Sequence, residues 1–172
     1  CGRAVAGYEE LLERIGASGG ELGIELAIAM VGMKRTWVFP YRGFGQAWAE
    51  RLVSTSGELA VDLRASDVGR HRQSRLLYWI GYGFAWTRRL EGEIAGQPAW
   101  LDATRVEMER KTRFPYRGYG FAWTQEMSGR CGERVALTLE ATDVARRMRY
   151  EFPYQGFGYA WMSTARLTLA LA

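Results

Sequence analysis

The side chains that most often carry chemistry are few in this sequence and lie far apart. It contains one histidine, His71, and two cysteines, Cys1 and Cys131. A single histidine in a basic turn is far more often a surface residue than a general base or a metal ligand. Two distant cysteines and one histidine also lack the spacing of a zinc or haem site. The sequence therefore predicts no catalytic residue, no metal and no cofactor.

The acidic residues do not form a recognisable catalytic pair. Asp67 and Asp143 occupy equivalent positions of an internal repeat, and we expect them to cap turns by hydrogen bonding to the local backbone. Asp62 lies on the strand face opposite to its aliphatic neighbours, so it faces either the solvent or a polar interior shared with Arg64. The glycines of the GYG and GFG segments lack the lysine and the following helix of a phosphate-binding loop. We therefore expect a protein without enzymatic activity.

The first residue of the sequence suggests a different chemistry, the covalent attachment of lipid. A chain that begins Cys1-Gly2-Arg3 resembles a bacterial lipoprotein after removal of its signal peptide, when the N-terminal cysteine carries the lipid. This resemblance implies an exported protein that is lipid-anchored through Cys1 in the cell envelope, in the periplasm or on the outer surface. A disulfide between Cys1 and Cys131, or a cysteine left by cloning, would explain the same residue.

The overall composition is that of one globular domain. The chain has 172 residues, of which 48% are hydrophobic, with a net charge of +4 and a sequence pI near 9.3. Arginines are scattered among acids, and the densest basic cluster is Arg70, His71, Arg72 and Arg75. This pattern favours a charged, soluble surface over a surface that binds nucleic acid. No segment reaches the run of about 20 apolar residues that a membrane-spanning helix requires.

One aromatic segment occurs four times in the chain. It reads FPYRGFGQAW at 39–48, YWIGYGFAW at 78–86, FPYRGYGFAW at 114–123 and FPYQGFGYAW at 152–161. The tryptophans that end the four copies are 38, 37 and 38 residues apart. Of the 23 aromatic residues, only Tyr8 and Trp100 lie outside these segments and their immediate flanks. Such a period indicates one supersecondary unit that is used four times.

The hydrophobic pattern predicts a short helix followed by strands. Residues 7–17 carry a helical apolar stripe, and from residue 21 onward apolar residues alternate with a period of two. Turn-forming residues occur at 34–35, 54–57, 68–70, 92–98, 110–111, 128–132 and 144–146. They divide this part into eight strands, at 21–33, 36–54, 58–68, 74–91, 97–109, 112–127, 133–143 and 147–171.

Two strands per repeat give four hairpins of about 38 residues in an antiparallel meander. Closure of eight long strands would remove the exposed edges of a flat sheet. We therefore expect an all-β fold, an eight-stranded antiparallel up-and-down β-barrel formed by residues 21–172, after an N-terminal anchor segment and short helix in residues 1–20. A β-sandwich is the alternative.

The large side chains change faces within each aromatic segment. In the last copy, Tyr154 shares a strand face with Gly156 and Gly158, whereas Phe157 and Trp161 lie on the opposite face. A bulge near the proline would bring all aromatic side chains into one core, whereas a regular strand would leave the second group facing outward. The limited interior of an eight-stranded barrel favours the outward band. The candidate interface residues in this band are Phe44, Trp48, Tyr82, Phe84, Trp86, Tyr119, Phe121, Trp123, Phe157, Tyr159 and Trp161.

An outward aromatic band needs something to cover it. Tyr, Trp and Arg are also the residue types that contribute most to protein interfaces. We therefore expect a non-enzymatic structural or accessory subunit that docks through this aromatic and Arg-rich surface onto a membrane protein complex or a further copy of itself, and not onto nucleic acid. Two alternatives remain open. They are a barrel that binds a ligand or carbohydrate, as calycins and lectins do, and a small outer-membrane β-barrel.

Overall fold

The chain forms one helix followed by eight antiparallel strands. The structure is a computed structural model that describes residues 2–38, 42–55, 59–75, 80–113, 117–151 and 155–171. Its elements are α1 (Gly2–Ala17), β1 (Glu21–Val38), β2 (Arg42–Ser54), β3 (Val61–Arg75), β4 (Ile80–Ile94), β5 (Gln97–Arg113), β6 (Arg117–Cys131), β7 (Val135–Glu151) and β8 (Gln155–Leu171). Each strand pairs with the next, and β8 pairs with β1. The predicted eight-stranded up-and-down β-barrel is confirmed, and the alternative β-sandwich is not adopted.

Four of the predicted turns are wrong. The sequence pattern placed turns at 34–35, 68–70, 110–111 and 144–146, but these residues lie inside β1, β3, β5 and β7. Most of their charged side chains are exposed, so they do not interrupt the strands. The first hairpin instead reverses between Val38, where β1 ends, and Arg42, where β2 begins. The turn predicted within 92–98 is confirmed, with Ala95 and Gly96 at φ of 51° and 79°.

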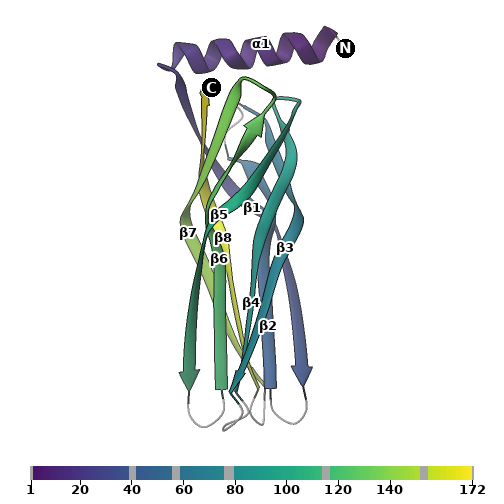
Figure 1. The fold of residues 1–172 in the computed structure, drawn as a ribbon, viewed down its shortest axis with the longest axis vertical. Coiled ribbons are helices and arrows are strands. Elements are labelled where there is room, and N and C mark those ends of the chain that lie inside the picture. The colour runs from purple at the N-terminus through teal and green to yellow at the C-terminus, as the bar shows by residue number, and fades with distance from the viewer. Residues whose placement is uncertain are drawn as a thin grey trace.

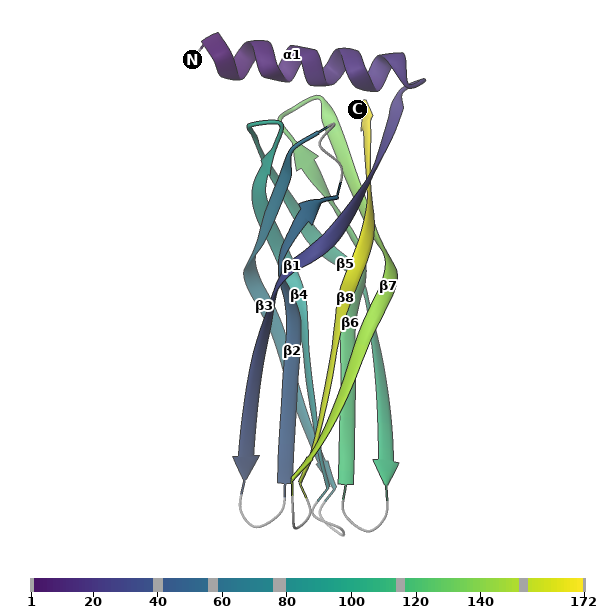
Figure 2. The ribbon, with the colours of Figure 1, turned by 180° about the vertical axis from the view of Figure 1, so that it is seen from behind.

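The barrel has two halves that differ in strand pairing (Figures 1 and 2). In the half next to α1, here called the capped half, neighbouring hairpins are joined by short ladders such as Arg51–Val53 with Asp62–Arg64. The other half, here called the hairpin half, spans 31–49, 68–87, 106–124 and 144–162. Its described residues pair only within the hairpins β1–β2, β3–β4, β5–β6 and β7–β8. Contacts other than a continuous sheet must therefore hold the hairpin half together.

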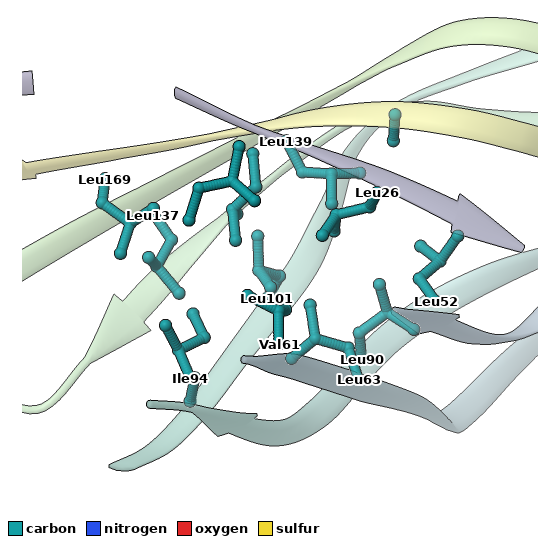
Figure 3. Close-up of a cluster of buried hydrophobic side chains, with 14 of the residues drawn as sticks. Leu26, Leu52, Val61, Leu63, Leu90, Ile94, Leu101, Leu137, Leu139 and Leu169 are labelled. Atoms are coloured by element: carbon teal, nitrogen blue, oxygen red, sulfur yellow. The ribbon is translucent and has the colours of Figure 1, made fainter. Parts of the chain in front are cut away.

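The core of the capped half is aliphatic. Figure 3 shows its side chains converging from strands around the barrel, and Leu26, Leu63 and Leu139 are at most 1% exposed. Each such leucine contributes about 1.5–3 kcal/mol through removal of apolar surface from water. An eight-stranded barrel is just filled by side chains of this kind, which leaves the capped half as a packed core.

Helix α1 lies across the end of the capped half (Figures 1 and 2). Leu11 and Ile15, one helical turn apart, are 1% and 0% exposed because they pack onto the barrel core. The Tyr8 hydroxyl donates a hydrogen bond to the Cys131 carbonyl and accepts one from the Arg134 N–H, both at 2.9 Å. The predicted helix is thus confirmed, begins earlier than residue 7, and is fixed to the turn between β6 and β7.

Strand pairing is irregular at one site in each hairpin, between the two halves. Ile28 pairs with Leu52 and Val31 pairs with Ala49, so the register is the same on both sides of the irregularity. The aromatic strand itself is regular from Arg42 to Ala49, and the bulge that one interpretation required near the proline is absent from the paired residues.

Asp67 and Asp143 lie at these irregular sites inside β3 and β7, so their prediction as turn caps is wrong. The local hydrogen bond expected for Asp143 does form, because its Oδ1 accepts from the Val144 N–H at 3.0 Å.

Candidate functional site

The aromatic segments pack the four hairpins against one another. The second strand of each hairpin is here called its inner strand (β2, β4, β6 and β8) and the first its outer strand (β1, β3, β5 and β7). On each inner strand, glycines and an alanine occupy one face, and the other face carries aromatic side chains and, in β2, Gln46. The Phe44 ring of β2 lies on the glycine face of β4, where a Cβ added to Gly81 would be 2.9 Å from the ring. The Phe157 ring of β8 lies in the same way on β2, 2.8 Å from a Cβ added to Gly43. The hairpins therefore form a closed ring in which the aromatic face of each covers the glycine face of the next.

The sequence-predicted interface residues are consequently internal. Eight of the eleven are at most 7% exposed, and three tryptophans are half-buried. The buried residues are Phe44, Tyr82, Phe84, Tyr119, Phe121, Trp123, Phe157 and Tyr159, and the half-buried ones are Trp48, Trp86 and Trp161. The expectation of an exposed aromatic band is corrected, because a neighbouring hairpin covers this face. Only the Arg-rich part of the predicted surface is exposed.

Arginines of the outer strands extend the cover over these rings. Their guanidinium carbons lie 5.0 to 5.9 Å from the ring centroids, within the range of a cation–π interaction. Between adjacent hairpins the pairs are Arg35 over Phe157, Arg70 over Trp48, Arg72 over Phe44, Arg110 over Tyr82 and Arg146 over Trp123. Stacking on a ring holds each guanidinium group in one orientation.

Charge is segregated along the barrel. The sequence ranges of the hairpin half contain thirteen of the 23 Lys and Arg residues and three of the 19 Asp and Glu residues, a net charge of +10. The rest of the chain contains ten and sixteen, a net charge of −6. Nine of the cations have exposed side chains in the described residues: Lys34, Arg35, Arg70, Arg72, Arg110, Lys111, Arg146, Arg147 and Arg149. The net charge of the whole chain is therefore small because a strongly basic half is offset by an acidic remainder.

A polar groove of about 420 Å³ opens in this half between β1 and β3. Its lining residues are Lys34, Thr36, Gln46, Arg70, His71 and Arg72. Sequence reasoning treated the cluster at 70–75 as an ordinary charged surface and predicted no site here. One signal was present: Gln46 stands where the other three copies of the repeat have an aromatic residue.

The polar contacts of the capped half bind hairpins to each other. Asp62 faces solvent, as one of the two predictions had it, and pairs with Arg51 at 2.7 Å across β2 and β3. The hydrogen bond from Arg51 lowers the pKa of Asp62. Arg89 and Asp102 form the equivalent pair across β4 and β5 at 3.0 Å. These partly exposed ion pairs contribute to the joining of neighbouring hairpins.

Cys131 is a free, fully buried thiol under α1. Burial raises its pKa to about 11, so the thiol stays protonated at pH 8. We expect Cys131 to resist iodoacetamide at pH 8 in the folded protein and to react within minutes in guanidinium chloride, as followed by mass spectrometry. Fast alkylation of the folded protein would contradict this burial. The alternative Cys1–Cys131 disulfide is not formed, because the Cys131 thiol is free. Cys1 lies outside the described residues, so its lipid attachment stays a prediction.

Neither a metal site nor a helical membrane span is found in the part of the chain that the structure describes. Its His, Cys, Asp and Glu side chains form no group of three or more suited to hold a metal ion. Its one helix is not long and apolar enough to cross a membrane.

Comparison with known proteins assigns no family to this chain. No protein-family model, no curated protein and no solved structure matches it. The charge and the geometry of the basic half are therefore the basis for a functional proposal.

Proposed function

We propose that the protein is a non-catalytic accessory protein of the cell envelope that docks through its hairpin half onto an anionic membrane surface. The segregation of charge, +10 in the hairpin half against −6 elsewhere, carries this proposal. A basic surface near anionic lipids gains about 1 kcal/mol per Lys or Arg side chain. The acidic capped half disfavours the opposite orientation by charge repulsion.

Apolar side chains among the cations support a lipid partner over a purely ionic one. Met33, Met108, Met148 and Tyr150 are 45%, 46%, 38% and 39% exposed on the outer strands of the hairpin half. A surface that mixes long cationic side chains with apolar ones suits the boundary between headgroups and acyl chains. A duplex nucleic acid would use the charges but offer nothing to these apolar groups.

The proposal retains the Arg-rich part of the surface that the sequence predicted and drops the aromatic part, which is internal. Export and lipid attachment at Cys1 belong to the same proposal, because an anchored protein would act at a membrane. The helix that follows Cys1 lies at the end of the barrel opposite to the hairpin half (Figures 1 and 2). An anchor there would leave the basic half free to reach a second surface.

Sedimentation with lipid vesicles tests the docking. We expect the protein to bind vesicles that contain phosphatidylglycerol, to ignore vesicles of phosphatidylcholine alone, and to be released by about 0.5 M salt, which shortens the range of electrostatic attraction. The double variant Lys111→Gln, Arg147→Gln should bind about 30-fold more weakly, because two cations contribute about 2 kcal/mol. Both side chains are exposed.

A charge-matched variant in the capped half provides the control. Arg88→Gln, Arg130→Gln removes two exposed cations from the acidic half and should leave vesicle binding unchanged. If the two double variants lost equal affinity for the vesicles, docking through the hairpin half would be contradicted. Binding to native membranes but not to protein-free vesicles would contradict a lipid partner and indicate a membrane protein instead. Binding to DNA but to no membrane would contradict both kinds of partner.

A further inference from the structure

The first copy of the aromatic repeat differs from the other three inside the hairpin half. Two residues before its tryptophan it has Gln46, where the other copies have Phe84, Phe121 and Tyr159. Gln46 is 4% exposed and its Nε2 donates to the Phe84 carbonyl at 3.2 Å. A glutamine side chain fills less space than a ring, and the groove of about 420 Å³ lies directly against it.

The groove walls carry cations on both sides. Lys34 comes from β1, opposite Gln46 in the hairpin ladder, and Arg70 and Arg72 come from β3 of the next hairpin. The two arginines stack on Trp48 and Phe44, with guanidinium carbons 5.3 and 5.4 Å from the ring centroids. They are therefore held in place before any ligand arrives, which lowers the entropic cost of binding.

The equivalent arginines at two other interfaces already have partners within the chain. Arg146, which corresponds to Arg70, pairs with Glu109 of the preceding hairpin at 2.5 Å. Arg110, which corresponds to Arg72, donates to Gln73 at 2.9 Å.

No carboxylate lines the β1/β3 groove, and its three cations form no ion pair with any described residue. Three cations that line one groove and have no counter-ion among the described residues fit an external anion that carries more than one charge.

We propose that the β1/β3 groove is a binding site for a phosphomonoester, the dianionic phosphate group of a lipid headgroup or of a soluble phosphate ester. Arginine pairs well with phosphate because its planar N–H edge matches two phosphate oxygens, and Lys34 adds a point charge. The Thr36 hydroxyl supplies a further donor at the groove wall. The volume exceeds that of one phosphate group and leaves room for the alcohol part of the ester. As a lipid site, the groove rests on the proposed membrane docking and adds headgroup selectivity to it.

Vesicles of equal surface charge test the lipid source. Phosphatidic acid carries a phosphomonoester, whereas phosphatidylglycerol carries a phosphodiester. Vesicles of the two lipids are prepared with the same zeta potential, so that they differ in the type of phosphate group and not in surface charge. We expect the protein to bind the phosphatidic acid vesicles about tenfold more tightly, because the groove pairs with the second charge. Calorimetric titration with glycerol 3-phosphate tests the soluble source of the same group.

The variant Gln46→Phe tests the groove without changing charge. It restores the residue type of the other copies and fills the groove, so it should remove the lipid preference and any binding of glycerol 3-phosphate. If this variant does not fold, Arg70→Gln, Arg72→Gln gives the same test. The control Lys111→Gln, Arg147→Gln should lose affinity for both lipids while its preference stays the same.

The outcomes separate this site from the docking proposal. Equal binding to both vesicles together with no heat from glycerol 3-phosphate would overturn the groove and leave membrane docking intact. Binding of glycerol 3-phosphate without any vesicle binding would support the groove with a soluble ligand and overturn the docking. A lipid preference that persists in both groove variants would also overturn the site.

Discussion

The variant Gly83→Ala is expected to destabilise the protein by about 3 kcal/mol, at the upper end of the cost of overpacking. A Cβ at this position would lie 2.4 Å from the Gly45 carbonyl oxygen and 2.8 Å from the Gly45 nitrogen, both backbone atoms of the adjacent inner strand. Backbone atoms cannot rotate aside as a side chain can. The methyl group therefore has to push two hairpins apart, and the aromatic side chains between them lose contact.

Thermal unfolding followed by circular dichroism measures this effect, which should lower Tm by about 10 °C for a chain of this size. Gly16→Ala is the control, because a Cβ added at this helical glycine meets nothing within 4 Å apart from its chain neighbours and the backbone of its own helix. That substitution should stabilise the protein by about 0.5 kcal/mol through helix propensity. Gly83→Ala with unchanged Tm would contradict the close packing of the inner strands.

Local patterns in the sequence were sufficient to predict most of the fold. Period-two alternation in segments such as Leu59–Ala65 marks the strands of the capped half, where one face meets the core and the other meets solvent. The fourfold repeat gave the number of hairpins. Predicted turns in the hairpin half were misplaced because charged residues look like turn residues. Lys34 and Arg35 are examples, and both are exposed residues inside β1.

The packing of the hairpin half could not be deduced by considering one strand at a time. The change of bulk from one face of the aromatic strand to the other is visible in the sequence, but the pattern of a single strand does not show that the neighbouring hairpin covers its large face. Both faces of each inner strand are buried, since Phe84 and Gly83 alike lie between hairpins. A repeat that offers one small face and one large face is complementary to a second copy of itself, and four copies close the ring.

The candidate groove was missed for a related reason. Repeats draw attention to what the copies share, and the groove depends on Gln46, where one copy departs from the others. Its cations come from β1 and β3, which are far apart in sequence and are not hydrogen-bonded to each other in the hairpin half. Comparing each position across all four copies would have singled out Gln46, but only the structure shows which cations lie beside it.

The capped half is stabilised by its aliphatic core and not by the packing of glycine faces against aromatic faces. The variant Leu63→Ala tests this core. Leu63 is 0% exposed within the aliphatic core, so we expect a loss of about 3 kcal/mol from lost burial and the cavity left behind. Met30→Ala, at a side chain that is 52% exposed, is the matched truncation and should change stability by less than about 0.5 kcal/mol.

Near-UV circular dichroism then distinguishes the two halves. Gly83→Ala should change the aromatic signal, because eleven aromatic side chains of the described residues lie between the hairpins. Leu63→Ala should lower stability with the aromatic signal intact. Chemical denaturation gives the free energies of unfolding for both variants. An altered aromatic signal in Leu63→Ala would show that the aliphatic core and the aromatic ring of hairpins are one packing unit, contrary to the division of the barrel drawn from its strand pairing.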